Sequence, residues 1–198
     1  MPPKRTRGAT APPRRSLAGR PADTTGKLID AVVDALRDVG YDRLSMRDIC
    51  RRAGVTHATA YGYFASKQHL VSEAFHRSLV EWSTRPIFGD TAGDRLAHTF
   101  VGLGQFMAED PSLNIAAMAA MLADDADVHR LRGSAGDLIG RKLADALGDR
   151  ATPAALDALN MAVSGAMLHA GMGFTSYEAM VQRLKRMGEL VLAETPGG

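Results

Sequence analysis

The 198-residue chain has one cysteine, Cys50, and one tryptophan. A single cysteine excludes a disulfide framework and a multi-cysteine zinc site, and it is typical of proteins from a reducing compartment. No apolar run approaches the roughly 18 residues that a membrane-spanning helix needs. The basic N-terminal stretch is not followed by the apolar region of a secretory signal. These absences predict a cytoplasmic protein that does not enter a membrane.

The motifs of the common catalytic sites are missing as well. The sequence has no G-x-S-x-G, no H-E-x-x-H, no P-loop and no dinucleotide-binding glycine pattern. Three histidines in the C-terminal two-thirds, His98, His129 and His169, have no ligand-like spacing to one another. We therefore expect no catalytic residues, no metal and no cofactor.

Acidic residues are absent from the first 22 positions, which carry six basic side chains and five prolines. Residues 23–80 hold eight basic and seven acidic groups, and residues 81–198 hold ten and fifteen, so the net charge of +2 is the sum of +6, +1 and −5. A proline-rich, charged segment cannot bury enough apolar surface to fold alone. We predict a disordered basic arm at 1–22 that attracts nucleic acid.

The rest of the chain shows apolar side chains every three or four residues and no strand-like alternation. Stops such as Gly40 and helix caps divide it into about nine helices, which predicts an all-α fold. The predicted capping residues are Ser45, Thr56, Ser66, Asp110, Thr152 and Thr175. The boundaries that we predict fall near 24–39, 45–53, 56–63, 66–85, 91–109, 110–124, 128–147, 152–170 and 175–191. Three short helices and the start of a fourth form an N-terminal unit at 23–70, followed by a helical domain at 71–198.

The stretch from Asp48 to Lys67 carries three linked motifs. It reads D-I-x-x-x-A-G-V at a helix–turn, T-x-Y-x-Y-F along the next helix, and S-K at the start of a fourth. Gly54 stands where a tight turn between helices needs positive φ. Over about 24–70 this set resembles the helix-turn-helix DNA-binding domain of TetR-family transcriptional regulators.

The resemblance implies which side chains meet DNA. His57, Ala58 and Tyr61 are expected to face the major groove, and Arg47 to reach a base from the preceding helix. Thr59, Tyr61, Tyr63 and Lys67 are similar to phosphate contacts, with packing an equal alternative for Tyr63. The implied DNA site comprises Arg47, Thr56, His57, Ala58, Thr59, Tyr61, Tyr63 and Lys67.

Eight of the ten methionines lie after residue 100. Core packing is the simpler explanation for any single one. Together with the aromatic residues they also suit an adaptable apolar pocket, and TetR-family proteins hold their effector in this part of the chain. The candidate pocket residues are Trp82, Phe100, Leu103, Met107, Met118, Met121, Leu122, Met167, His169 and Met172.

The last two predicted helices look like the dimer-forming pair of the family, and the final one is apolar on both faces, which favours a four-helix interface with a second copy. The candidate interface residues are Leu159, Val163, Ala166, Ala170, Leu184 and Val191.

These features predict a homodimeric DNA-binding regulator, a repressor that a small apolar effector releases from a palindromic double-stranded DNA operator. Two alternatives stay open. One is an architectural DNA-binding protein without an effector, and the other is a small-molecule enzyme that retained a helix-turn-helix.

Overall fold

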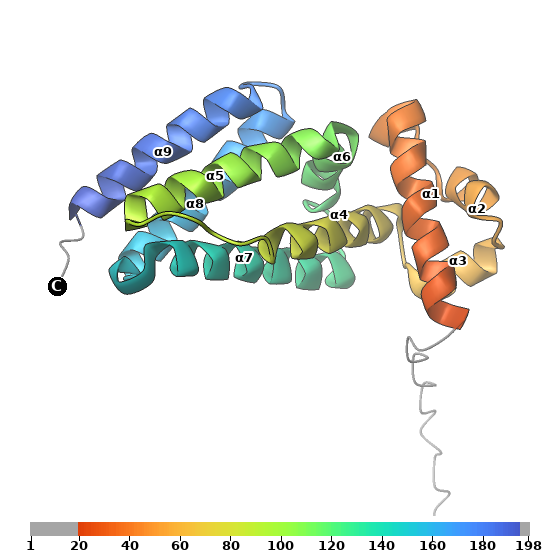
Figure 1. Cartoon of the computed structure of the whole chain (residues 1–198). Helices are drawn as coiled ribbons and strands as arrows, with labels where there is room; N and C mark the ends of the chain where they lie inside the picture. Colours follow the sequence, from red (N-terminus) through yellow and green to blue (C-terminus); the bar gives the residue numbers. More distant parts are fainter. Residues whose placement is uncertain (1–19, 195–198) are drawn as a thin grey trace, which may run out of the picture.

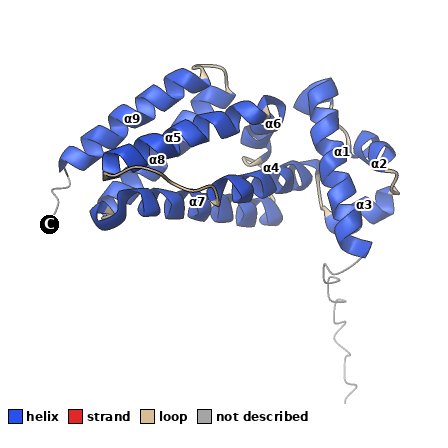
Figure 2. Cartoon of the chain, in the orientation of Figure 1, coloured by secondary structure: helices blue, strands red, loops and turns tan. Residues whose placement is uncertain are grey.

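The computed structural model describes residues 20–194, and residues 1–19 and 195–198 lie outside the described range (Figure 1). The predicted basic arm at 1–22 thus lies almost entirely outside it. Within residues 20–194 every regular element is a helix (Figure 2). The all-α prediction is confirmed.

Nine α-helices and one short 3-10 helix make up this range. Their bounds are α1 Arg20–Arg43, α2 Met46–Ala53, α3 His57–Tyr63, α4 Lys67–Ser83, α5 Ala92–Glu109, α6 Pro111–Ala120, α7 Ala126–Leu147, η1 Gly148–Arg150, α8 Pro153–Gly171 and α9 Tyr177–Glu194.

Helix α1 differs from its prediction at both ends. It begins at Arg20, four residues before the predicted start at 24. The predicted stop at Gly40 is present as a break inside the helix, where φ is 70° and ψ is 172°. One further helical turn, Tyr41–Arg43, follows this break because glycine allows the chain to change direction without strain.

Side-chain caps start the short helices as the sequence indicates. The Ser45 hydroxyl accepts the Asp48 amide at the start of α2, and Gly54 ends that helix with φ 65°. The Thr56 hydroxyl accepts the Thr59 amide at the start of α3. Asp48 bonds to the Ser45 hydroxyl, so its carboxylate holds the cap in place.

Side-chain caps also start the longer helices, and two helix boundaries differ from their predictions. Helix α6 ends at Ala120, short of the predicted acidic run, because Asp125 in that run caps α7. At the start of α9 the capping hydroxyl comes from Ser176 and not from the predicted Thr175, since the Ala179 amide donates to Ser176 Oγ.

Helices α1, α2 and α3 form a small unit at one end of the molecule, and α4 runs from it into a bundle with α5 to α9 (Figure 1). The apolar core is continuous between the two parts, because α4 and α6 pack against α1. No helix within residues 20–194 is both long and apolar enough to cross a membrane.

Candidate nucleic-acid interface

The turn between α2 and α3 fixes the direction of α3. The Val55 amide donates to the Cys50 carbonyl across this turn, and Gly54 supplies its left-handed residue. On the inner side of α3, Ala60 is fully buried and Phe64 follows it into the core. Helix α3 is therefore held from one side only, and its other side faces solvent.

The solvent-facing side of α3 carries the side chains that the resemblance places in a DNA groove. His57, Ala58, Thr59 and Tyr61 are all exposed, and Tyr61 keeps 51% of its surface accessible. The rings of His57 and Tyr61 lie next to each other, with centroids 5.9 Å apart. Hydroxyl and imidazole groups on one exposed helix face can form hydrogen bonds to phosphates and base edges.

Three other predicted contacts lie at the rim of this surface. Arg47 is exposed in the first turn of α2, and none of the ion pairs among residues 20–194 involves it. Tyr63 is half-buried against the core, so it also packs. Lys67 Nζ donates to the Tyr41 carbonyl at 3.0 Å and lies 4.4 Å from the Tyr41 ring centroid.

The neighbouring arginines of α2 are engaged within the chain. Arg52 Nη1 lies 2.6 Å from Asp38 Oδ2 and thereby ties α2 to α1. Arg51 lies 3.7 Å from Asp48, one turn before it. Arg47 is thus the arginine of this helix for which no ion pair is found, although its charge contributes to lowering the pKa of Asp48.

Comparison with known proteins agrees with this geometry. The sequence model described as "Bacterial regulatory proteins, tetR family" matches residues 28–74, which span α1 to the first half of α4. An uncharacterized HTH-type transcriptional regulator of Mycobacterium tuberculosis is 33% identical over 172 residues, 86% of this chain and 81% of the relative. This chain belongs to the TetR family. It is a DNA-binding transcriptional regulator.

Two further comparisons extend the family likeness to the rest of the molecule. The HTH-type transcriptional repressor KstR of Rhodococcus jostii is 29% identical over 127 residues, 62% of this chain and 59% of the relative. A crystal structure of a TetR regulator from Rhodococcus sp. RHA1 superposes with a TM-score of 0.76 at 18% identity, over 90% of this chain and all of that one. This last match shows a shared fold.

In this TetR-family chain the candidate pocket residues differ in how deeply they are buried. Trp82, Phe100, Leu103, Met107, Met121 and Met167 are buried in the bundle. Met118 is half-buried, whereas Leu122, His169 and Met172 are exposed. The last three cannot line an enclosed apolar site in this structure, because they lie at helix ends where the bundle no longer covers them.

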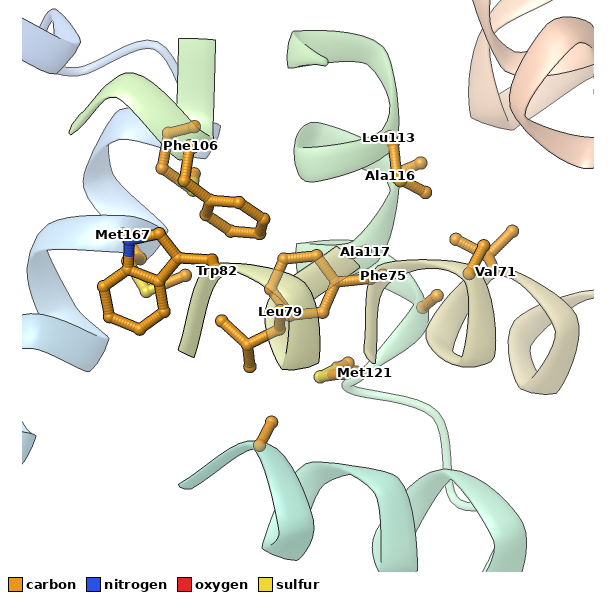
Figure 3. Close-up of a cluster of buried hydrophobic side chains, with 14 of the residues drawn as sticks. Val71, Phe75, Leu79, Trp82, Phe106, Leu113, Ala116, Ala117, Met121 and Met167 are labelled. Atoms are coloured by element: carbon orange, nitrogen blue, oxygen red, sulfur yellow. The ribbon is translucent and has the colours of Figure 1, made fainter. Parts of the chain in front are cut away.

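Figure 3 shows the aromatic centre of the bundle, in which Trp82 and Met167 lie beside Phe106 and Phe75. The ring of Phe106 is 5.9 Å from that of Phe75 and 6.0 Å from that of Trp82. Phe75 was not among the candidates, although its spacing to Leu79 and Trp82 along α4 marks one helical face. We call Phe75, Trp82, Phe106, Met121 and Met167 the aromatic cluster.

Most of the candidate interface residues lie inside the chain. Leu159, Val163, Ala170 and Leu184 are buried, and Ala166 and Val191 are half-buried, because these positions pack α8 and α9 onto each other and onto the bundle. The apolar side chains left on the outside are Met161, Met187 and Leu190, which keep 70%, 38% and 63% of their surface. The interface itself stays a prediction, and these exposed side chains are the large apolar ones of α8 and α9 that a second copy could reach.

A surface groove of about 220 Å³ runs between the outer sides of α8 and α9. Met161, Gly165 and His169 line it from α8, and Met187 and Arg183 line it from α9. We call Met161, Gly165, Met187 and Leu190 the α8–α9 outer face.

Proposed function

We propose that this regulator is a homodimeric repressor that binds a near-palindromic operator and leaves it when a small apolar molecule enters the bundle. The observation that carries the proposal is the outer side of α3, where His57, Thr59 and Tyr61 stand exposed on a helix that the core holds from behind. The repressor role draws support from the two relatives named KstR, in Mycolicibacterium smegmatis and Rhodococcus jostii.

Base reading is assigned to the N-terminal unit up to about residue 70. Side chains at the start of α3 would enter the major groove, and the Thr56 cap leaves the positive helix end directed toward a phosphate. Lys67 uses one of its three donors on the Tyr41 carbonyl, so two remain for a phosphate. Arg47 supplies an unpaired guanidinium suited to guanine.

Effector binding is assigned to the helical domain from residue 71 onward. The aromatic cluster lies between α4, α5, α6 and α8, and only residues 64–66 separate α3 from α4. A ligand that separated Trp82 and Phe106 would displace α4, and α4 would carry α3 with it. Such a ligand shifts the equilibrium only by its difference in affinity for the two arrangements.

Dimerisation is assigned to the α8–α9 outer face. Three large apolar side chains and a glycine share this surface, and a glycine on a helix lets a second helix approach closely. Burial of this face against a second copy would place two α3 helices on one side of the dimer, as a two-fold operator requires.

The test is a selection of tight-binding duplexes from a random-sequence pool with the full chain, followed by footprinting. The expected product has two inverted half-sites with centres about 34–36 Å apart. Apolar compounds are then screened for those that raise the melting temperature of the protein and release the selected duplex.

Two outcomes would contradict the proposal in different ways. Selection of no preferred sequence, with no compound bound, favours the architectural alternative. A single half-site in the footprint would exclude the two-fold arrangement while leaving α3 as the reading helix.

A further inference from the structure

Two helices of the bundle begin where the bundle meets the N-terminal unit, and both are capped by an aspartate. Asp110 caps α6 and Asp125 caps α7. A carboxylate has two oxygens, and capping needs only one of them. The second oxygen of Asp110 reaches α1 in the N-terminal unit, and that of Asp125 reaches Ser66 in the link between α3 and α4.

Asp110 joins α6 to α1. Its Oδ1 accepts the Leu113 amide at 3.0 Å, which is the cap. Its Oδ2 accepts Arg37 Nη2 at 2.6 Å, and only 16% of the Asp110 side chain is exposed. Arg37 also approaches Asp34 on its own helix at 3.4 Å, which is a longer contact. Arg37 thus pairs with both Asp34 and Asp110, and its contact with Asp110 is the shorter one.

Asp125 joins α7 to α4. Its Oδ1 accepts the amides of Asp127 at 2.9 Å and Val128 at 3.2 Å. Its Oδ2 accepts the Ser66 hydroxyl at 3.0 Å, and Ser66 is itself the cap of α4. The starts of α4 and α7 are therefore bonded to each other through their own capping residues.

The electrostatics keep Asp125 charged. Burial acts against ionisation and is the largest influence on this carboxyl, but the Val128 amide, the Ser66 hydroxyl and the Asp127 amide together hold its pKa below the usual value. Asp125 is therefore an anion near neutral pH and a strong acceptor for both partners.

The other side-chain caps of the bundle behave differently. Thr91 caps α5, Thr152 caps α8 and Ser176 caps α9, each with a single hydroxyl oxygen. Their bonds stay within the first turn of their own helices. Among the bundle helices within residues 20–194, only α6 and α7 have a capping carboxylate whose second oxygen bonds to a residue outside its own helix.

We propose that Asp110 and Asp125 are positioning residues for DNA binding, which set the orientation of the α1–α3 unit on the bundle. They bracket α6, which packs against α1, α4 and α8, so a displacement of α6 changes both attachments together. The proposal needs only that the chain binds DNA through α3, and it holds with or without an effector.

The apparent affinity for a specific duplex depends on the fraction of molecules in which the N-terminal unit is correctly oriented. If loosening of the attachments leaves about one tenth of the molecules with the N-terminal unit correctly placed, the apparent Kd for a specific duplex rises about tenfold. Attraction to phosphates at random sequence depends on charge and far less on orientation. The ratio of specific to random affinity is therefore the measurement that reports positioning.

The first variant is Asp110→Asn, which keeps an oxygen for the Leu113 amide and replaces the oxygen that faces Arg37 by a donor. We expect an unchanged melting temperature and a specific-to-random ratio lowered by about tenfold. Arg37→Gln is expected to give the same loss, and the double variant no more than either single one. Arg37→Lys keeps the positive charge, so it is expected to lower the specific-to-random ratio less than Arg37→Gln does.

The second variant is Asp125→Ser, because serine caps a helix well but is too short to reach Ser66 as well. The matched control is Asp94→Asn, which removes a charge from the first turn of α5 without any contact to the N-terminal unit. The probe is a duplex selected from a random pool by the unaltered chain, compared with a random duplex of equal length.

An unchanged ratio in Asp110→Asn and Asp125→Ser would overturn the proposal, as would an equal fall in Asp94→Asn. Additive losses in Asp110→Asn and Arg37→Gln would show that the pair does not act as a unit. Failure of the unaltered chain to select any duplex refutes the operator proposal instead, because positioning is then not measured at all.

Discussion

At the scale of single residues, Arg47 is well placed to contribute to the proposed binding of DNA. It lies in the first turn of α2, exposed, while Arg51 and Arg52 on the same helix are paired with Asp48 and Asp38. An unpaired guanidinium can make the bidentate contact to guanine that specifies a base.

We predict that Arg47→Ala weakens binding to the selected duplex by about 1–3 kcal/mol and binding to random duplex much less. The measurement is fluorescence anisotropy at one fixed salt concentration. Arg141→Ala, an exposed arginine on α7 in the bundle, is the control and should leave both affinities unchanged. An equal loss on both duplexes would make Arg47 a phosphate contact.

The burial of Cys50 follows from its sequence pattern, whereas the burial of Lys142 does not. Cys50 stands on an apolar stripe, and the structure buries it and raises its thiol pKa through desolvation, as expected for an unreactive core residue. Lys142 is also buried, with Nζ donating to the carbonyls of Ser83 and Arg85 near the Trp82 ring. Sequence alone gave no sign of it, because its partners are backbone atoms more than 50 positions away.

At the scale of elements, the contact between α5 and α9 depends on a glycine. A Cβ at Gly104 would lie 2.5 Å from Val181 Cγ2, so α9 can pack this closely only because residue 104 has no side chain. By contrast, Gly136 in the middle of α7 has open space around its Cα.

We predict opposite effects for the two alanine substitutions. Gly104→Ala should lower the free energy of unfolding by about 1–2 kcal/mol, because overpacking outweighs the gain in helix propensity. Gly136→Ala should raise it by about 0.5–1 kcal/mol through propensity alone. Urea denaturation followed by circular dichroism measures both, and stabilisation by Gly104→Ala would show that α9 moves away at little cost.

Helix starts were easier to predict than helix ends. Caps at Ser45, Thr56, Ser66, Asp110 and Thr152 are all observed, because an oxygen two or three residues before an amide is a local signal. The ends of α4 and α6 depend on how loops return over the bundle, which is not a local property.

At the scale of the whole molecule, charge is divided unevenly along the chain. Residues 1–19 hold five basic side chains and no acidic ones, whereas residues 81–198 have a net charge of −5. Since α1 begins at Arg20, a deletion that ends at residue 19 removes no residue of a described helix.

We predict that deletion of residues 1–19 reduces the dependence of DNA affinity on salt concentration and leaves the preference for the selected duplex nearly unchanged. Each phosphate contact contributes about −0.9 to the slope of log K against log salt, so loss of a few contacts is readily measured. A slope identical to that of the full chain would show that the segment takes no part in binding.

The sequence by itself determined the helical class, the family and which side chains of α3 are proposed to contact DNA. These depend on local periodicity, on capping residues and on one contiguous motif from Asp48 to Lys67, so neighbouring residues suffice to specify them. The tertiary structure decided which apolar residues of α8 and α9 stay outside, because burial depends on all helices at once. It also decided that Asp110 and Asp125 hold the N-terminal unit, because each bond joins residues 59 or more positions apart and no local pattern encodes such a contact.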